Sequence, residues 1–136
     1  MPVNTVFSWF IRKRLHQIDL FRRYPLDVQA EGLRYHLEAT ASTAFGREHG
    51  ITADTTPEAY RRQVPLRDYN GMKPWIERVR DGETDVLWPG SVKWHAKSSG
   101  TTSDRSKFIP VTEAALERCH YKGGKDLLAM YVDCLL

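Results

Sequence analysis

The stretch Ser98–Ser106 contains the residue types in this sequence that could do chemistry. It is rich in serine and threonine, contains Gly100 and no hydrophobic residue, and is followed directly by Lys107. Hydroxyl and main-chain N–H groups donate hydrogen bonds to phosphate oxygens, a glycine lets the backbone approach closely, and an ammonium group supplies positive charge. Arg105 offers a second cation, which Asp104 opposes. The stretch therefore predicts either a loop that surrounds a phosphate chain or a polar hairpin connection with ordinary turn chemistry.

Two familiar nucleotide-binding motifs are absent from the sequence. The Gly124-Lys125 step is followed by Asp126, and Cys119 stands where the first glycine of G-x-x-x-x-G-K-[ST] would be. No G-x-G-x-x-G occurs either. Cys119 and Cys134 lack metal-ligand spacing. We therefore predict no metal-ligating residue and assign no catalytic residue.

Two β-like runs flank the serine- and threonine-rich stretch and must position it. Val92–Lys97 alternates apolar and polar residues with a period of two, and Lys107–Val111 is the second run. These runs predict a β-hairpin within residues 91–112 that carries the loop at its tip.

The rest of the chain is expected to be helical. Capping residues, prolines and glycines set the predicted boundaries. The first predicted helix is Val6–Arg23, capped by Asn4 or Thr5 and ended by Tyr24-Pro25, and the second is Leu26–Ala44, followed by Gly46. A short third helix starts at Thr56-Pro57 and ends just before Val64-Pro65. The fourth is Arg67–Arg80, weakened by Pro74 and closed by Gly82, and a final helix is capped by Thr112.

Apolar spacing predicts which helix faces are buried. The first helix is expected to turn six apolar residues inward: Phe7, Phe10, Ile11, Leu15, Ile18 and Phe21. Arg14 and Arg22 are expected to project into the same face. The final helix has an expected inward stripe of Leu116, His120, Gly123, Leu127, Met130 and Cys134. A glycine on such a stripe suggests that another backbone comes close to it.

Composition and charge exclude several classes of protein. Of the 136 residues, 41% are hydrophobic and 27% charged, which is typical of globular proteins. No apolar run approaches the ~20 residues of a membrane span. The net charge of +3 is too small to predict a nucleic-acid surface. The basic excess is concentrated in the first helix, so an interaction or membrane-surface helix is one alternative. The low cysteine content favours a cytoplasmic protein.

The motif Ser98-Ser99-Gly100-Thr101-Thr102, followed after a spacer by Lys107, resembles the phosphate-binding loop of the adenylate-forming superfamily. The residues that follow, Phe108-Ile109-Pro110-Val111-Thr112, make the resemblance specific to one family within this superfamily. Other segments fit as well: Phe45-Gly46, Val64-Pro65, Trp75–Val79, Gly82-Glu83, Leu87–Pro89 and Cys119–Asp126. Together they resemble the bacterial branch of the auxin-responsive promoter (Gretchen Hagen) family of acyl acid amido synthetases. A glycine often follows the second threonine in the superfamily, whereas this chain has Ser103-Asp104.

The resemblance implies ATP and Mg²⁺ as cofactors, and a carboxylic acid and an amine as substrates. It implies that Ser98, Ser99, Thr101 and Thr102 donate hydrogen bonds to phosphates, that Gly100 permits close approach, and that Lys107 is the nearest cation. It also implies an α/β fold in which helix predominates, as a partial N-terminal lobe of an adenylate-forming enzyme.

Family members are several times longer, so we expect residues 1–136 to be one N-terminal segment of a larger domain. This segment would consist of a helical region (1–90), the hairpin (91–112) and a truncated helix (113–136). We expect the isolated chain to be inactive and prone to self-association through exposed apolar surface. A small non-enzymatic module that binds nucleotides or other anions is the alternative.

Other candidates are given structural roles. His95 and His120 lack a cysteine or carboxylate constellation and are expected to be packed. The four tryptophans, Trp9, Trp75, Trp88 and Trp94, are expected in a core or an interface.

Overall fold

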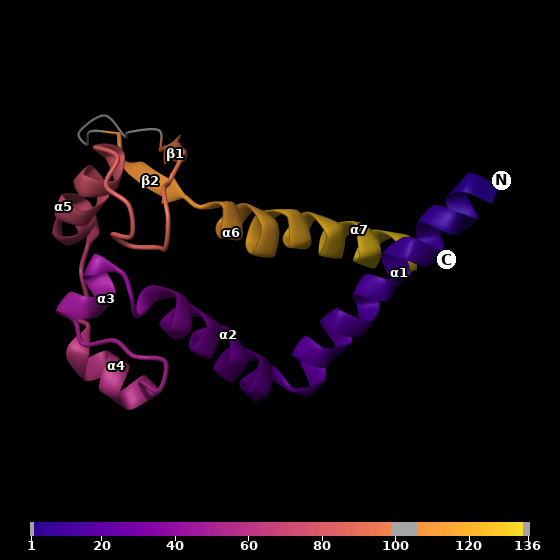
Figure 1. The fold of residues 1–136 in the computed structure, drawn as a ribbon. Helices are drawn as coiled ribbons and strands as arrows, with labels where there is room; N and C mark the ends of the chain where they lie inside the picture. The colour runs from indigo at the N-terminus through magenta and orange to yellow at the C-terminus, as the bar shows by residue number, and fades with distance from the viewer. Residues whose placement is uncertain (1, 99–105, 135–136) are drawn as a thin grey trace. The chain divides into compact units, whose positions relative to one another are not determined.

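The computed structural model describes residues 2–98 and 106–134, and within the first helix it describes the side chains of Trp9, Ile11 and the residues from Lys13 onward. Helix predominates, beside one two-stranded sheet in the described residues, as predicted (Figure 1). The elements are α1 (Pro2–Arg23), α2 (Pro25–Thr40), α3 (Ala44–Glu48), α4 (Pro57–Gln63), α5 (Tyr69–Arg80), β1 (Trp94–Lys97), β2 (Phe108–Val111), α6 (Glu113–Ala115), the π-helical turn η1 (Leu116–Tyr121) and α7 (Lys122–Cys134).

The chain forms two compact units. One, here called the helical unit, is Met1–Glu31 with Ala114–Leu136. The other, the hairpin unit, is Gly32–Glu113. The predicted site residues that the structure describes belong to the hairpin unit.

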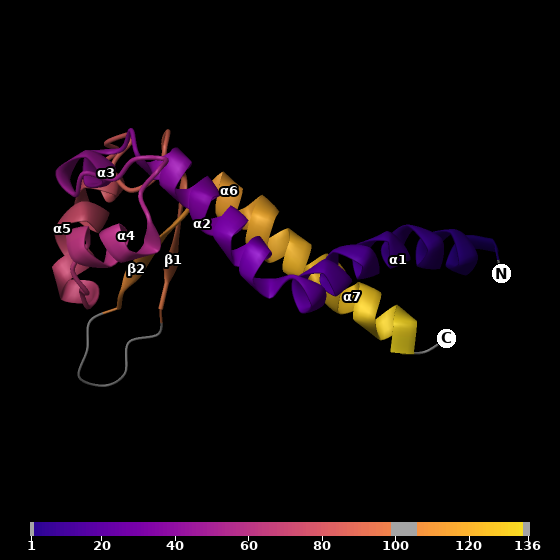
Figure 2. The same cartoon turned by 90° about the horizontal axis from the view of Figure 1, so that it is seen from below.

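In the helical unit, α1 and α7 lie side by side (Figures 1 and 2). Ile11 of α1 and Ala129 of α7 are buried. Arg14 and Asp126 join the two helices in an ion pair with an N–O distance of 2.7 Å, and their side chains are only 22% and 20% exposed. The predicted inward position of Arg14 is therefore confirmed, and Asp126 supplies its counter-charge.

Helix α1 differs from its prediction at both its start and its inward face. It already begins at Pro2, so a cap at Asn4 or Thr5 is wrong; proline is well tolerated in the first helical turn. Its end before Tyr24-Pro25 is confirmed. Phe21 is exposed rather than inward. Phe7 and Phe10 lie outside the described side chains.

The basic residues at the end of α1 are engaged within the helix itself. Arg22 and Arg23 both form ion pairs with Asp19, with N–O distances of 3.0 Å and 2.7 Å. Arg22 lies on the predicted face, because it lines a groove together with Leu15 and Ile18, but its side chain is exposed. These pairs lower the positive charge that α1 offers to an outside partner.

The predicted inward stripe of the final helix is wrong. Leu127 and Met130 are 65% and 45% exposed, and a Cβ on Gly123 would meet nothing within 4 Å. The π-helical turn η1 interrupts the constant 3.6-residue period that the prediction assumed. Ala129 is the fully buried residue of α7 instead.

The core of the hairpin unit is built on α5. Trp75 and Val79 pack with Val86, and Phe45 of α3 meets Trp75 edge to face with 5.3 Å between ring centroids. Because this apolar face is buried, α5 continues through Pro74 without a break. Asp68 caps its start, since the carboxylate accepts a hydrogen bond from the Gly71 N–H at 2.8 Å.

The prediction of a single helix over Leu26–Ala44 is wrong, because α2 ends at Thr40 and a new helix, α3, begins after Thr43. The Thr43 hydroxyl accepts a hydrogen bond from the Gly46 N–H at 3.0 Å and so caps α3. The N–H groups of Ala44 and Phe45 donate to main-chain carbonyls of the turn after α5, at 2.7 Å and 3.0 Å. Gly46 therefore lies inside α3, and not after the end of α2. The predicted start of α4 at Thr56 and Pro57 is confirmed.

The turn after α5 supplies those carbonyls and is held by charged groups. Gly82 adopts a φ of 91°, which confirms its predicted role in ending the helix. The Arg78 guanidinium donates to both carboxylate oxygens of Glu83, at 2.8 Å and 2.5 Å. This hydrogen bonding lowers the pKa of Glu83 and raises the pKa of Arg78. The Gly90 N–H donates to Asp85 at 2.8 Å and lowers the pKa of that carboxyl.

The sheet is an antiparallel pair, which confirms the predicted hairpin partners. The register places Trp94 opposite Val111, His95 opposite Pro110, Ala96 opposite Ile109 and Lys97 opposite Phe108. Both strands are shorter than predicted, and β2 lies against α5. The hairpin is thus anchored to the core by one of its strands.

Candidate functional site

The structure describes the two ends of the predicted phosphate loop. Ser98 follows β1 directly, and Lys107 directly precedes β2. Ser99, Gly100, Thr101 and Thr102 lie outside the described residues, so their predicted contacts stay predictions. The antiparallel pairing of β1 and β2 is what brings the two ends together.

Ser98 and Lys107 are hydrogen-bonded to each other twice. The Ser98 N–H donates to the Lys107 carbonyl at 2.9 Å, and the Lys107 N–H donates to the Ser98 hydroxyl oxygen at 3.1 Å. The hydroxyl acts as an acceptor in the second bond and keeps its own proton for a further acceptor. The base of the loop is therefore closed, while one predicted phosphate donor retains its donor function.

Tyr69 fixes this base to α5. Its hydroxyl accepts a hydrogen bond from the Phe108 N–H at 2.9 Å and donates to the Phe108 carbonyl at 3.3 Å. Tyr69 is the first residue of α5, so the helix cap at Asp68 also positions the ring. Sequence reasoning missed the Tyr69 hydroxyl, because no local signal reveals a partner 39 residues away.

Three cationic side chains lie near the rings of Tyr69 and Phe108 at the base of the loop. The Lys107 ammonium lies 5.7 Å from the centroid of the Tyr69 ring. The Arg80 guanidinium lies 4.1 Å from the Phe108 ring centroid, and the Lys97 ammonium lies 6.0 Å from it. Only Lys107 was singled out from the sequence. Lys97 could have been found by its place next to Ser98, whereas Arg80 could not, because α5 is distant in the chain.

The two histidines behave differently from each other. His95 is half-buried in β1, as predicted, and its Nε2 is buried without a hydrogen-bond partner among the described residues. Its register partner Pro110 has no N–H group to donate. His120 is exposed beside Tyr121, so its predicted packing is wrong.

The tryptophans are not all in a core. Trp75 is buried as predicted, and Trp88 is half-buried against the rings of Tyr35 and His36. Trp9 and Trp94 are 62% and 49% exposed, so neither lies in a core, and a place in an interface stays a prediction for both.

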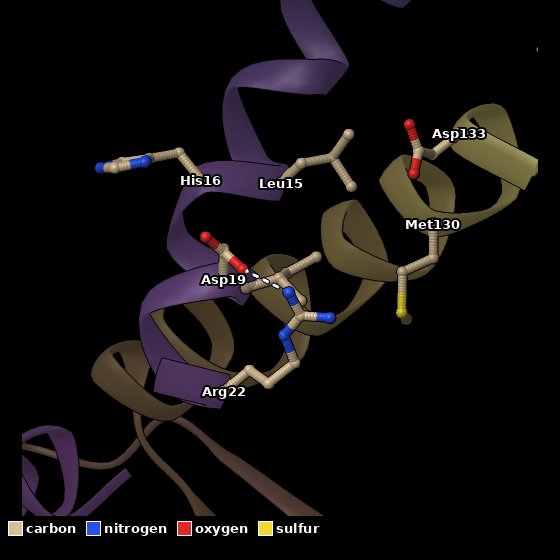
Figure 3. Close-up of a pocket in the computed structure, with 7 residues that line it drawn as sticks. Leu15, His16, Asp19, Arg22, Met130 and Asp133 are labelled. Atoms are coloured by element: carbon tan, nitrogen blue, oxygen red, sulfur yellow. Dashed lines mark hydrogen bonds and ion pairs between the residues drawn. The ribbon is translucent and has the colours of Figure 1, made fainter. Parts of the chain in front are cut away.

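A groove of about 460 Å³ lies between α1 and α7 in the helical unit (Figure 3). Its lining mixes apolar and charged side chains: Leu15, His16, Ile18, Asp19, Arg22, Met130 and Asp133. The Asp19 carboxylate accepts a hydrogen bond from Arg22 at 3.0 Å, so these two opposite charges are paired with each other inside the groove. Ser98 and Lys107, the described ends of the predicted phosphate loop, are not among the residues that line it.

The described residues form no group of three or more histidine, cysteine, aspartate or glutamate side chains able to hold a metal ion. None of the helices in the described ranges is both long enough and apolar enough to traverse a lipid bilayer.

Comparisons with known proteins agree on one family. The profile of the GH3 family N-terminal domain matches residues 14–134. The jasmonoyl–L-amino acid synthetase GH3.5 of Oryza sativa subsp. japonica is 32% identical over 104 residues, which cover 76% of this chain and 18% of that protein. The indole-3-acetic acid-amido synthetase GH3.17 of Arabidopsis thaliana is 34% identical over 93 residues, or 67% of this chain and 15% of that protein.

A third relative, the jasmonoyl–L-amino acid synthetase JAR6 of Nicotiana attenuata, is 30% identical over 91 residues, covering 66% of this chain and 16% of that protein. The chain therefore spans less than a fifth of the length of these relatives.

Proposed function

This chain belongs to the GH3 family, and on that premise we propose that it forms the phosphate-binding part of an ATP-dependent acyl acid amido synthetase. In the first step of the proposed reaction, a carboxylate oxygen attacks the α-phosphorus of ATP and the bond to the departing pyrophosphate breaks. In the second step, the amine of an amino acid attacks the acyl carbon, an amide forms and AMP leaves. Adenylation is needed because a free carboxylate has no good leaving group.

The observation that carries this proposal is the closed base of the loop. Ser98 and Lys107 face each other across two hydrogen bonds, at the position where the chain enters and leaves the loop. The Ser98 hydroxyl proton and the Lys107 ammonium are donors that suit phosphate oxygens. Their role would be to hold the β- and γ-phosphates and to stabilise the negative charge that develops on departing pyrophosphate.

The remaining loop residues complete the proposed site. Ser99, Thr101 and Thr102 would add hydroxyl donors, and Gly100 would let the main chain approach the phosphates. Mg²⁺ commonly keeps several water ligands and binds substrate phosphates, so it would reach the site bound to ATP. When bound, it would neutralise part of the phosphate charge.

We further propose that residues 1–136 act as one N-terminal segment of a larger adenylate-forming domain. A phosphate loop alone cannot orient both a carboxylate and an amine for reaction, and orientation provides a large share of the rate. The matched relatives are more than five times longer than the region that they share with this chain. The isolated chain would therefore bind ATP without completing either step.

Two measurements on the full 136-residue chain test this function. Isothermal titration with ATP should show binding that Lys107→Gln weakens about fivefold or more, because one close charge is lost. Lys93→Gln, at an exposed lysine before β1, is the matched control and should leave the affinity unchanged. Release of pyrophosphate over a panel of carboxylic acids should stay at the background rate. Absence of ATP binding would contradict the proposed site, and turnover would contradict the need for further parts.

A further inference from the structure

Arg80, Lys97 and Lys107 form a group of positive charges that we call the cation cluster. Arg80 and Lys97 lie around the same ring, with their charged groups 4.1 Å and 6.0 Å from the Phe108 centroid, and are thus within about 10 Å of each other. The Lys107 ammonium lies 5.7 Å from the centroid of the Tyr69 ring, and the Tyr69 hydroxyl is hydrogen-bonded to the main chain of Phe108. Three segments of the chain therefore bring positive charges to the region around Tyr69 and Phe108.

Backbone hydrogen bonds hold these segments together. Lys97 is the register partner of Phe108, and directly paired residues point to the same face of a sheet. Tyr69 bonds to both main-chain polar groups of Phe108 and ties β2 to α5, which carries Arg80 in its last turn. The fold consequently keeps the segments that carry Arg80 and Lys97 next to each other.

The charges of Arg80 and Lys97 are not neutralised by the described part of the protein. Neither residue forms an ion pair with any described residue, whereas Lys73 and Arg78 of the same helix pair with Glu77 and Glu83. Like charges held close together without a counter-charge favour the binding of an anion that carries several charges.

We propose that Arg80 and Lys97 form an anion subsite beside Lys107 for the terminal phosphates of ATP and for pyrophosphate. This inference rests on the proposed function and adds two residues to it. A guanidinium binds two phosphate oxygens at once, and an ammonium acts as a point charge, so the pair suits a diphosphate group. AMP, which has a single phosphate, gains little from a subsite for the terminal phosphates. The subsite would therefore favour pyrophosphate and ATP over AMP.

The test is isothermal titration of the full chain with sodium pyrophosphate and, separately, with AMP. Arg80→Gln and Lys97→Gln are each expected to weaken pyrophosphate binding about fivefold, and the double variant about 25-fold, with less than a twofold change for AMP. Lys93→Gln is the matched control for Lys97, because the Lys93 ammonium also lies 6.0 Å from an aromatic ring, that of Trp94. Arg62→Gln, in the last turn of α4, is the control for Arg80. Both controls should change pyrophosphate binding less than twofold.

Arg80→Lys separates charge from packing, since it keeps the charge and loses the planar guanidinium. Partial recovery of the lost pyrophosphate affinity in Arg80→Lys supports a role of the charge in anion binding, because lysine supplies the charge without the contact to two oxygens. If Arg80→Gln binds pyrophosphate as tightly as the Arg62→Gln control, the role of Arg80 is overturned. If Lys107→Gln weakens binding while Arg80→Gln and Lys97→Gln match their controls, the subsite is wrong and the proposed function stands. If the unaltered chain binds neither pyrophosphate nor ATP, both proposals are overturned.

Discussion

Replacement of Gly46 by alanine is expected to destabilise the hairpin unit strongly. Gly46 is a buried residue of α3, and its N–H donates to the capping hydroxyl of Thr43 at 3.0 Å. A Cβ at this position would lie 2.0 Å from the Thr40 carbonyl oxygen and 2.9 Å from the carbonyl carbon. These are backbone atoms, so no side-chain rotation can relieve the overlap.

The magnitude follows from the size of the movement required. Separation to the 3.0 Å that real Cβ contacts respect needs a shift of about 1 Å between α3 and the end of α2. Overpacking of this kind costs about 1–3 kcal/mol. We expect the upper half of that range, because the same shift disturbs the hydrogen bonds from Ala44 and Phe45 to the turn after α5. The helix propensity of alanine, worth up to about 1 kcal/mol over glycine, opposes this loss without cancelling it.

Gly32→Ala is the matched control. Gly32 lies inside α2, and a Cβ there would meet nothing within 4 Å. This variant should gain about 0.5–1 kcal/mol, since only the helix propensity changes. Urea unfolding followed by circular dichroism measures both variants. Equal stability of the two, or a gain for Gly46→Ala, would refute the packing argument at Gly46.

Three further substitutions test other contacts. Tyr69→Phe removes both hydrogen bonds to Phe108, should cost about 1–2 kcal/mol, and should speed hydrogen exchange at the Phe108 amide; unchanged exchange would contradict the contact. Asp85→Asn tests pH dependence. The folded-state pKa of Asp85 is lowered, so its charge stabilises the fold above the ordinary pKa, and this contribution is lost as the pH falls through the folded-state value. The stability difference between wild type and this variant should thus shrink in urea unfolding below about pH 4, and a constant difference would argue against the hydrogen-bonded carboxylate. Asp126→Ala leaves Arg14 without its partner and should cost about 1–3 kcal/mol, whereas Arg14→Met combined with Asp126→Leu should recover most of it in the same assay. A double variant no more stable than Asp126→Ala would count against this role of the pair.

Local sequence signals predicted several element boundaries. Thr56 and Pro57 start α4, Tyr24-Pro25 separates α1 from α2, and Gly82 ends α5, because capping, proline geometry and positive φ act within a few residues. The hairpin was also predictable, since the alternation in β1 and the polar loop are visible in the sequence.

Long-range contacts decided the features that the sequence did not reveal. The separation of α2 from α3 depends on the main-chain carbonyls of Asp85 and Val86, which accept hydrogen bonds from the start of α3. The sequence around Thr43 contains no signal that predicts these distant acceptors. The inward face of α7 lies at Ala129, and the final helix contains the π-helical turn η1, so the constant helical period assumed from the sequence does not hold.

The candidate site also has a part that the local sequence predicts and a part that long-range packing decides. Ser98 and Lys107 were predicted from their place at the ends of a polar loop. Their anchoring by Tyr69 and the addition of Arg80 depend on the packing of α5 against β2, and this packing joins parts of the chain that are distant in sequence.

The most direct measurement is nuclear magnetic resonance of the full chain during titration with pyrophosphate and, separately, with AMP. Pyrophosphate should shift the main-chain amide signals of residues 98–107 most strongly, with smaller shifts around Phe108 and Arg80, and AMP should shift them much less. Pyrophosphate shifts that are absent from residues 98–107, or that are confined to the groove between α1 and α7, would contradict a phosphate-binding role for this loop.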